Sequence, residues 1–253
     1  MLTNSVAVSA MAFALVFGAA LFGFFLRTVS PEHNLSADSK DVVKLGMGLV
    51  STMAALVLGL LIASAKSSYD AQSAALMDNS AKVVLLDRVL SHYGPETKET
   101  RELLRAAVLH ILDRTWPKTG ENSAQPPDPS TGAEILLDKI LELSPKDETQ
   151  HALKAQALNI LWALGQTRWL QYTQQSSSIS TPLLTTLVFW LAVVFVSFGL
   201  FAPRNAIVIS SIAMSAVAVS GAIFMILEMY RPYTGLLQIS SAPMRAALAQ
   251  LGR

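Results

Sequence analysis

The stretch AIVISSIAMSAVAVSGAIFMILEMYRPYTG, Ala206 to Gly235, decides the fold because it joins an apolar run of membrane length to an abrupt polar ending. No charged side chain precedes Glu228 in this stretch. A helix needs about 20 apolar residues to cross roughly 30 Å of hydrocarbon. The run therefore predicts a transmembrane helix that ends near Leu227.

The polar ending forms a membrane-boundary motif. Glu228 and Arg231 are spaced i, i+3, so they can pair with each other or reach lipid headgroups where the hydrocarbon ends. Pro232, Tyr233 and Gly235 follow, and the proline and the glycine predict a turn. Residues 241–252 then predict a short amphipathic helix that lies on the bilayer or docks under the rest of the chain.

Three other runs of similar length lack charged residues, namely Val6–Leu26, Leu45–Ala65 and Leu183–Ala202. The short connection APRN joins the last two spans and requires them to lie antiparallel. The composition agrees, since 52% of the residues are hydrophobic and only 15% are charged. We expect an all-α membrane protein with four transmembrane helices in two hairpins and a helical cytoplasmic bundle between them.

These patterns divide the chain into four parts. The parts are a first transmembrane hairpin at 1–65, a helical cytoplasmic region at 66–182 with a Pro-rich loop at 117–132, a second transmembrane hairpin at 183–227, and a turn with a short amphipathic C-terminal helix at 228–253. The second span has no Gly or Pro after it as far as Tyr69, so its helix should continue into the cytoplasmic region. No alternating strand pattern occurs in 66–182.

Two further helices of the cytoplasmic region can be outlined from the sequence. The first covers about 96–116, with one apolar face formed by Leu104, Val108 and Ile111. The second begins at SPKD with Ser144 as N-cap and runs to about Gln174. It carries Trp162 and Trp169, which fit either a membrane-interface belt or the core of the bundle, and we favour the core.

Small and hydroxyl-bearing residues recur at helical spacing on two spans. They are Gly48, Thr52, Ala55 and Gly59 on the second span, and Ser211 and Ser215 on the fourth. Such stripes let helix backbones approach each other in lipid. They can also line a conduction path on the axis of an oligomer. Both interpretations stay open.

The sequence lacks the usual signatures of catalysis and of metal binding. It has no Gly-rich phosphate loop, no nucleophile elbow and no paired histidines at metal spacing. It has no cysteine, and its net charge of +1 argues against a nucleic-acid partner. We therefore expect no enzyme activity, no cofactor and no metal site. The spans carry no ionisable residue at mid-depth, which argues against a proton-coupled transporter.

Lys and Arg residues near the spans are almost balanced between the two sides, five against four, so they do not decide the orientation. A cysteine-free region that follows two spans commonly stays in the cytoplasm. We therefore expect the N-terminus, residues 66–182 and the C-terminus to be cytoplasmic.

Four stretches carry a resemblance to a known family. They are VVLLDRVLSHYGPETKETRELLR, LGQTRWL at Leu164–Leu170, FWLAVVFVSFGLFAPRN, and LEMYRPYTGLLQISSAPMRAAL near the C-terminus. Together they resemble the bacterial membrane proteins known as bestrophin-like, and the resemblance spans nearly the whole chain. It implies the bacterial inner membrane as location.

Bestrophins are oligomeric anion channels with four spans per subunit and a helical cytosolic region, so the resemblance also implies a homo-oligomer and an inorganic anion as cargo. No acidic cluster here matches a calcium clasp, and calcium gating is not implied. Two hypotheses follow. The first is an oligomeric ion channel in the lipid bilayer, conducting anions. The second is a membrane-anchored scaffold or signalling protein whose helical bundle binds a partner.

Overall fold

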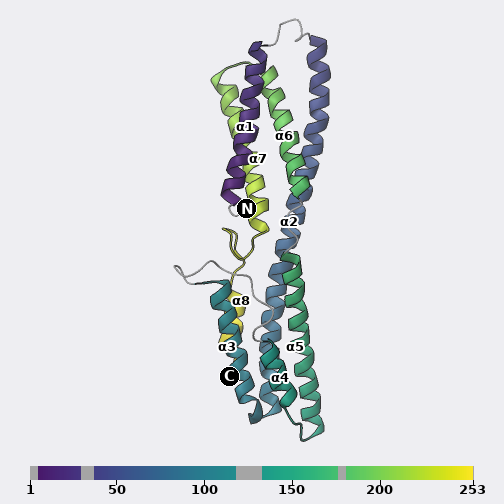
Figure 1. The fold of residues 1–253 in the computed structure, drawn as a ribbon, viewed down its shortest axis with the longest axis vertical. Coiled ribbons are helices and arrows are strands. Elements are labelled where there is room, and N and C mark those ends of the chain that lie inside the picture. The colour runs from purple at the N-terminus through teal and green to yellow at the C-terminus, as the bar shows by residue number, and fades with distance from the viewer. Residues whose placement is uncertain (1–4, 30–36, 118–132, 176–180, 253) are drawn as a thin grey trace. The chain divides into compact units, whose positions relative to one another are not determined.

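The computed structural model describes residues 5–29, 37–117, 133–175 and 181–252, and within these ranges the regular secondary structure is entirely helical (Figure 1). The helices are α1 (Ser5–Val29), α2 (Ala37–Tyr93), α3 (Lys98–Thr115), α4 (Ala133–Glu142), α5 (Glu148–Gln175), α6 (Thr181–Phe201), α7 (Ala206–Met229) and α8 (Ala242–Gln250). A 3₁₀ turn at Pro95–Thr97 separates α2 from α3. The all-α class predicted from the sequence is confirmed. All of the predicted Pro-rich loop except Pro117 lies outside the described residues.

Contacts divide the chain into two compact units. The first unit comprises Met1–Ser68 and Ser178–Tyr230, and the second comprises Tyr69–Ser177 and Arg231–Arg253. Four helices are long and apolar enough to cross a membrane: Ser5–Val29, Asp41–Tyr93, Pro182–Phe201 and Ala206–Met229. They contain the four predicted spans. As predicted, α2 continues without a break beyond its apolar part, and it contributes to both units.

In the first unit, α1 packs along α6 and α7 (Figure 1). The closest approach is at Gly23 of α1 and Gly199 of α6. A Cβ atom added to Gly23 would collide with the carbonyl oxygen of Val196, and one added to Gly199 would collide with that of Ala20. The two backbones therefore touch where neither helix has a side chain, the arrangement that small residues permit between helices in lipid. Gly23 and Gly199 lie on the first and third spans, whereas the predicted small-residue stripes lie on the second and fourth.

Two arginines form hydrogen bonds between α1 and the connection that joins α6 to α7. Arg27 Nη1 donates to the carbonyl oxygen of Ala202, and Arg204 Nη2 donates to that of Phe24. Arg27 of α1 thus reaches the connection that follows α6, and Arg204 of that connection reaches α1. Asn205 caps the next helix, because its Oδ1 accepts from the Val208 amide at 2.8 Å.

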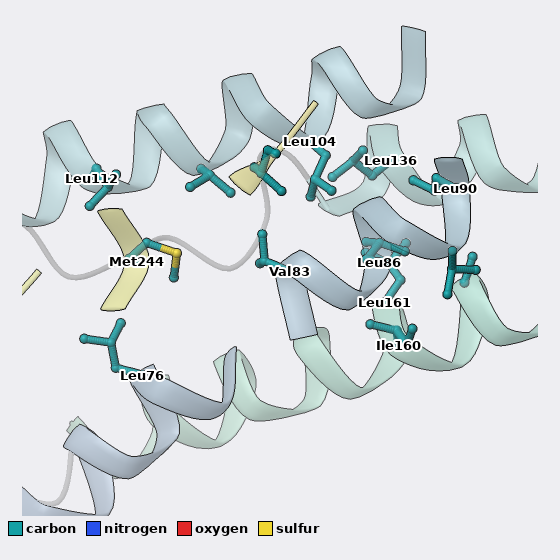
Figure 2. Packing of buried hydrophobic residues seen from close by; sticks show 14 of the residues in the cluster. Leu76, Val83, Leu86, Leu90, Leu104, Leu112, Leu136, Ile160, Leu161 and Met244 are labelled. Atoms are coloured by element: carbon teal, nitrogen blue, oxygen red, sulfur yellow. The ribbon is translucent and has the colours of Figure 1, made fainter. Parts of the chain in front are cut away.

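The core of the second unit lies between α2, α3, α4, α5 and α8 (Figure 2). Leu86 and Leu90 of α2 are fully buried, and they lie between Leu136 of α4 and Ile160 of α5. Full burial of a leucine side chain contributes about 1.5–3 kcal/mol to stability. The amphipathic half of α2 is thus the element around which the shorter helices assemble.

One detail of the predicted helices is wrong. The helix α5 begins at Glu148, and its N-cap is Asp147 instead of Ser144, because Asp147 Oδ1 accepts from the Gln150 amide at 2.7 Å. Gln150 Oε1 in turn accepts from the Lys146 amide at 2.8 Å, which completes a box-like cap. On α3, Leu104 and Val108 of the predicted face are buried together with Leu112, and Ile111 is half-buried.

The expectation that Trp162 and Trp169 belong to the core is also wrong. Their exposed fractions are 64% and 59%. The buried face of α5 is formed by Ala157, Ile160 and Leu161. At about 100° per residue, Trp162 and Trp169 lie on the opposite side of the helix.

We expect Gly23→Ala and Gly199→Ala each to destabilise the first unit by about 1–3 kcal/mol, because the added methyl group meets backbone atoms that cannot rotate away. Thermal unfolding in detergent, followed by circular dichroism, measures the loss. Gly18→Ala is the matched control, since no atom outside its own helix lies within 4 Å of its added Cβ. Equal unfolding temperatures for Gly23→Ala and Gly18→Ala would contradict the close contact.

Candidate functional site

A groove of about 650 Å³ opens in the first unit between α2, α6 and α7. Its lining comprises Lys44, Met47, Gly48 and Ser51 of α2, Ser197, Phe198 and Phe201 of α6 with the adjoining Ala202, and Val208, Ser211, Ile212 and Ser215 of α7. Each of the three helices thus brings at least one serine to an otherwise largely apolar wall. The groove lies within the part of the chain predicted to cross the membrane.

The polar groups of the groove are hydroxyls and one ammonium. Ser215 Oγ donates to the Ser211 carbonyl at 2.9 Å, and Ser197 Oγ donates to the Val194 carbonyl at 2.8 Å. In these bonds the hydroxyl presents its lone pairs to a cation, and it can donate to an anion when its proton turns away from the carbonyl. Among the described lining residues Lys44 alone is charged, and a positive charge favours an anion.

The ammonium group of Lys44 is exposed to solvent. Its Nζ lies 3.3 Å from Asp41 Oδ1, but both side chains are more than half exposed. An exposed pair of this kind is weak, since water screens the attraction and holding two flexible side chains costs entropy. The ammonium can therefore attract an anion to the end of the groove next to Ala202.

The structure brings three of the stripe residues predicted from the sequence into one site. Gly48 of the second span lines the groove together with Ser211 and Ser215 of the fourth. Thr52, Ala55 and Gly59 do not line it; they are exposed on α2. Thr52 Oγ1 donates to the Gly48 carbonyl at 2.9 Å, and around Gly59 no atom beyond its own helix lies within 4 Å of an added Cβ.

Sequence reasoning missed Lys44, Ser51 and Ser197 as lining residues. A signal for the first two was present, because Lys44 precedes Gly48 by four residues and Ser51 follows it by three, which places all of them on one helix face. Ser197 had no such signal. Its position in the groove depends on how α6 packs beside α7.

The membrane-boundary motif forms the turn that the sequence predicts. The Gly235 amide donates to the Arg231 carbonyl at 3.0 Å, and the Ile239 amide donates to the Pro232 carbonyl at 2.8 Å. Pro232 and Tyr233 are buried, as is Glu228 at the end of α7. A role for Glu228 and Arg231 at the lipid headgroups stays a prediction.

After the turn, the C-terminal segment docks into the core of the second unit. Tyr233 packs edge-on against Trp116, with ring centroids 5.8 Å apart, and Trp116 Nε1 donates to the Ile239 carbonyl at 2.9 Å. Met244 of α8 and the following Leu251 are buried in the same core (Figure 2). Of the two placements left open for the C-terminal helix, docking is the one observed.

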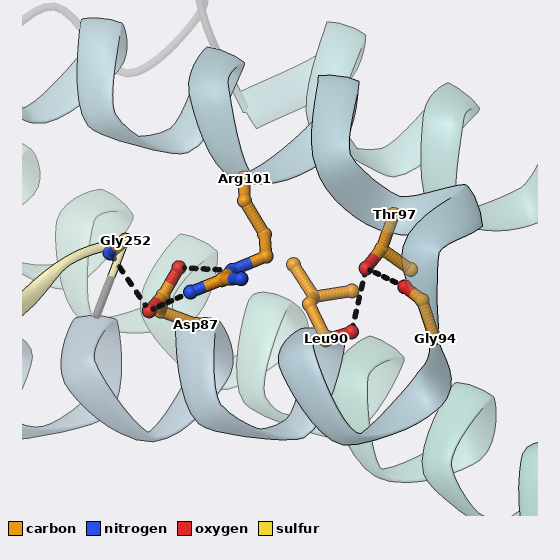
Figure 3. A network of polar contacts seen from close by, with 6 residues as sticks. All are labelled: Asp87, Leu90, Gly94, Thr97, Arg101 and Gly252. Carbon is orange, nitrogen blue, oxygen red and sulfur yellow. Dashed lines mark hydrogen bonds and ion pairs between the residues drawn. The ribbon is translucent and has the colours of Figure 1, made fainter.

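A buried carboxylate fixes the end of the C-terminal segment (Figure 3). Asp87 of α2 accepts two hydrogen bonds from Arg101 of α3, at 2.8 and 3.0 Å, and a third from the Gly252 amide at 3.2 Å. The hydrogen bonds to Asp87 raise the pKa of the Arg101 guanidinium. Gly252 adopts a φ of 84°, a conformation that favours glycine. One ion pair thus joins α2, α3 and the C-terminus.

Comparison with known families identifies one match. The model of the Bestrophin-like domain matches residues 13–244, which include the groove and the membrane-boundary motif. This confirms the resemblance seen in the sequence. No curated protein and no solved structure matches the chain significantly. Among the described residues, no group of three or more acidic and histidine side chains could hold a metal ion.

The docking of the C-terminal segment should depend on pH through Tyr233. Burial raises the pKa of Tyr233 to about 12. Since the pKa of an unfolded tyrosine is about 10, the folded state favours the neutral phenol. The stability that Tyr233 contributes is therefore fully present below pH ~10 and is lost as the pH rises through its folded pKa.

The ultraviolet absorbance of tyrosinate, measured as a difference between wild type and Tyr233→Phe, should show a group that titrates near pH 12. The phenylalanine variant keeps the ring contact with Trp116 and serves as the control for packing. A difference signal that titrates near pH 10, the value for an exposed tyrosine, would show that the phenol is not buried.

Proposed function

Because the chain belongs to the bestrophin-like family, we propose that it is an oligomeric membrane ion channel that conducts inorganic anions. The observation that carries the proposal is the groove between α2, α6 and α7. It brings the two predicted stripes together at Gly48, Ser211 and Ser215, and it has Lys44 at one end. A polar lining inside an apolar helix group is what an ion needs in order to exchange part of its hydration shell.

In the proposal, several copies together enclose the conduction path that a single chain leaves open. The groove is open, and Thr52, Ala55 and Gly59 continue along an exposed face of α2. A conduction path needs walls on all sides, since an ion in contact with lipid loses its hydration at great cost. In the proposal, a neighbouring copy closes the path along this face of α2.

The proposed channel has a defined location and orientation in the membrane. The four apolar helices cross the bacterial inner membrane as two hairpins. The second unit forms the helical cytoplasmic bundle, and both termini are cytoplasmic. Under this orientation Lys44 and the connection between α6 and α7 face the side opposite the cytoplasm. Anions would then enter the groove from that side, past the ammonium.

The alternative is a membrane-anchored scaffold or signalling protein. It is supported by the exposed aromatic side chain of Trp162 on the second unit, where a partner could bind. Flux measurements separate the two functions, because a scaffold needs no conduction path.

Anion efflux from liposomes that contain the purified protein tests the channel. We expect flux from the wild type and a loss of about tenfold or more for Ser215→Leu, since the larger side chain fills the groove and removes a hydroxyl. Met214→Leu is the matched control, because Met214 is exposed on α7 and does not line the groove. All variants must first show the same oligomer size.

Lys44→Met should lower the ratio of anion to cation permeability about two- to fivefold, as expected for the loss of one solvated charge at the entrance. Reversal potentials in a salt gradient measure this ratio. If the wild type carries no flux at any voltage or pH, the scaffold function replaces the channel. If it carries flux that Ser215→Leu leaves unchanged, conduction does not use the groove.

A further inference from the structure

The residues that line the groove between α2, α6 and α7 show how far it extends along the spans. On α2 the lining runs from Lys44 to Ser51, and on α7 it runs from Val208 to Ser215. Each of these stretches rises about 10 Å along its helix, at about 1.5 Å per residue. Half of the hydrocarbon core of a bilayer is about 15 Å thick. The groove therefore extends from the polar end of the spans into one leaflet.

The walls of the groove suit a hydrocarbon chain. Apart from Lys44 and four serines, the lining residues are apolar, and Phe198 of α6 is 46% exposed. The hydroxyls of Ser197 and Ser215 donate to carbonyls of their own helices, so they need no partner from outside. The volume of about 650 Å³ lies in the range of about 300–1,000 Å³ that is typical of small-molecule sites.

Three cationic groups lie at the polar end of the groove. Lys44 lines it, and Arg27 Nη1 donates to the carbonyl oxygen of Ala202, which is a lining residue as well. Arg204 belongs to the same connection, and all three cationic side chains are exposed. Asp41, whose Oδ1 lies 3.3 Å from Lys44 Nζ, is the only acidic side chain that the structure describes at this end. The described side chains here therefore carry a net positive charge.

We propose that the groove binds one anionic phospholipid. One acyl chain lies along the apolar walls, and the phosphate lies at the cationic end beside Lys44. An ammonium has three N–H donors and a guanidinium has five, of which a bond to one carbonyl uses one. Basic pockets between membrane helices bind the headgroups of anionic lipids. A free phosphate would leave the apolar walls unused, and a lipid without net charge would leave the positive end without its complement.

The binding itself requires only that these helices lie in a bilayer. Its regulatory consequence rests on the proposed function, because the groove is also the proposed conduction path. An acyl chain that fills the groove excludes anions from it. The bound lipid therefore acts as a regulator that keeps the path closed, and anions pass only after the lipid has left.

Native mass spectrometry of the full-length protein, released from micelles that contain phosphatidylglycerol or phosphatidylcholine, counts the lipids that stay bound. We expect the wild type to retain one phosphatidylglycerol per chain, with a preference of about tenfold or more over phosphatidylcholine. Lys44→Gln should reduce this preference about fivefold, the factor that one cation near an anionic lipid contributes. Lys98→Gln is the matched control, because Lys98 is exposed at the start of α3 in the second unit.

Gly48→Leu tests the walls of the groove separately from its charge. Gly48 lines the groove, and no atom outside its own helix lies within 4 Å of an added Cβ. The leucine therefore fits the fold and occupies the space of the acyl chain, and we expect retention of phosphatidylglycerol to fall about tenfold or more. Gly46→Leu is the matched control, since its added Cβ is equally unobstructed and Gly46 does not line the groove.

Equal retention of the two lipids by the wild type would overturn the inference, as would equal retention by either variant and its control. If no lipid is retained and Gly48→Leu alone changes the oligomer size, another copy of the chain fills the groove and the inference fails. Anion flux from liposomes separates this failure from that of the channel. Bound lipid without flux leaves the lipid site and removes the channel. Flux without bound lipid leaves the channel and removes the lipid site.

Discussion

The contact between the backbones of α1 and α6 at Gly23 and Gly199 is the constraint on which the first unit depends. Apolar side chains gain no hydrophobic free energy when they move from lipid into a helix interface. Helices in a membrane therefore associate through close packing and hydrogen bonds. The glycine pair provides the packing, and Arg27 and Arg204 provide hydrogen bonds at one end. With α1 seated against α6 and α7, the hydroxyls of α7 are left facing α2, and this arrangement creates the groove.

The second unit is held together mainly by the burial of apolar side chains away from water, a driving force that lipid does not provide. Burial of Leu86 and Leu90 drives its assembly, and the buried pair of Asp87 and Arg101 fixes which helices meet. A buried carboxylate is costly unless its oxygens are hydrogen-bonded, and here Arg101 and the Gly252 amide provide three bonds. The chain that leaves α7 enters this core almost at once, through Tyr233. Both units are thus built from the same long helix α2 and the same final third of the sequence.

The groove between α2, α6 and α7 is open on one side. Its serine hydroxyls at 197 and 215 donate to backbone carbonyls of their own helices, as hydroxyls inside an apolar helix group commonly do. Under the proposed function, a symmetric assembly of identical chains closes the groove, because every copy offers the same open surface to its neighbours. The match to the Bestrophin-like domain covers all of the residues that line the groove.

The sequence by itself determined the helical class, the four apolar helices, the continuation of α2 and the turn at Pro232, because membrane length, Gly and Pro placement and charge are local properties of the chain. It also indicated three of the twelve residues that line the candidate site, through the stripes that contain Gly48, Ser211 and Ser215. Only the tertiary structure decided which small residues touch, which serines share a groove, that Asp147 caps α5 and that Trp162 is exposed. These outcomes depend on how helices distant in sequence are rotated against each other, and a periodic apolar pattern leaves that rotation undetermined, since several faces of a membrane helix are equally apolar.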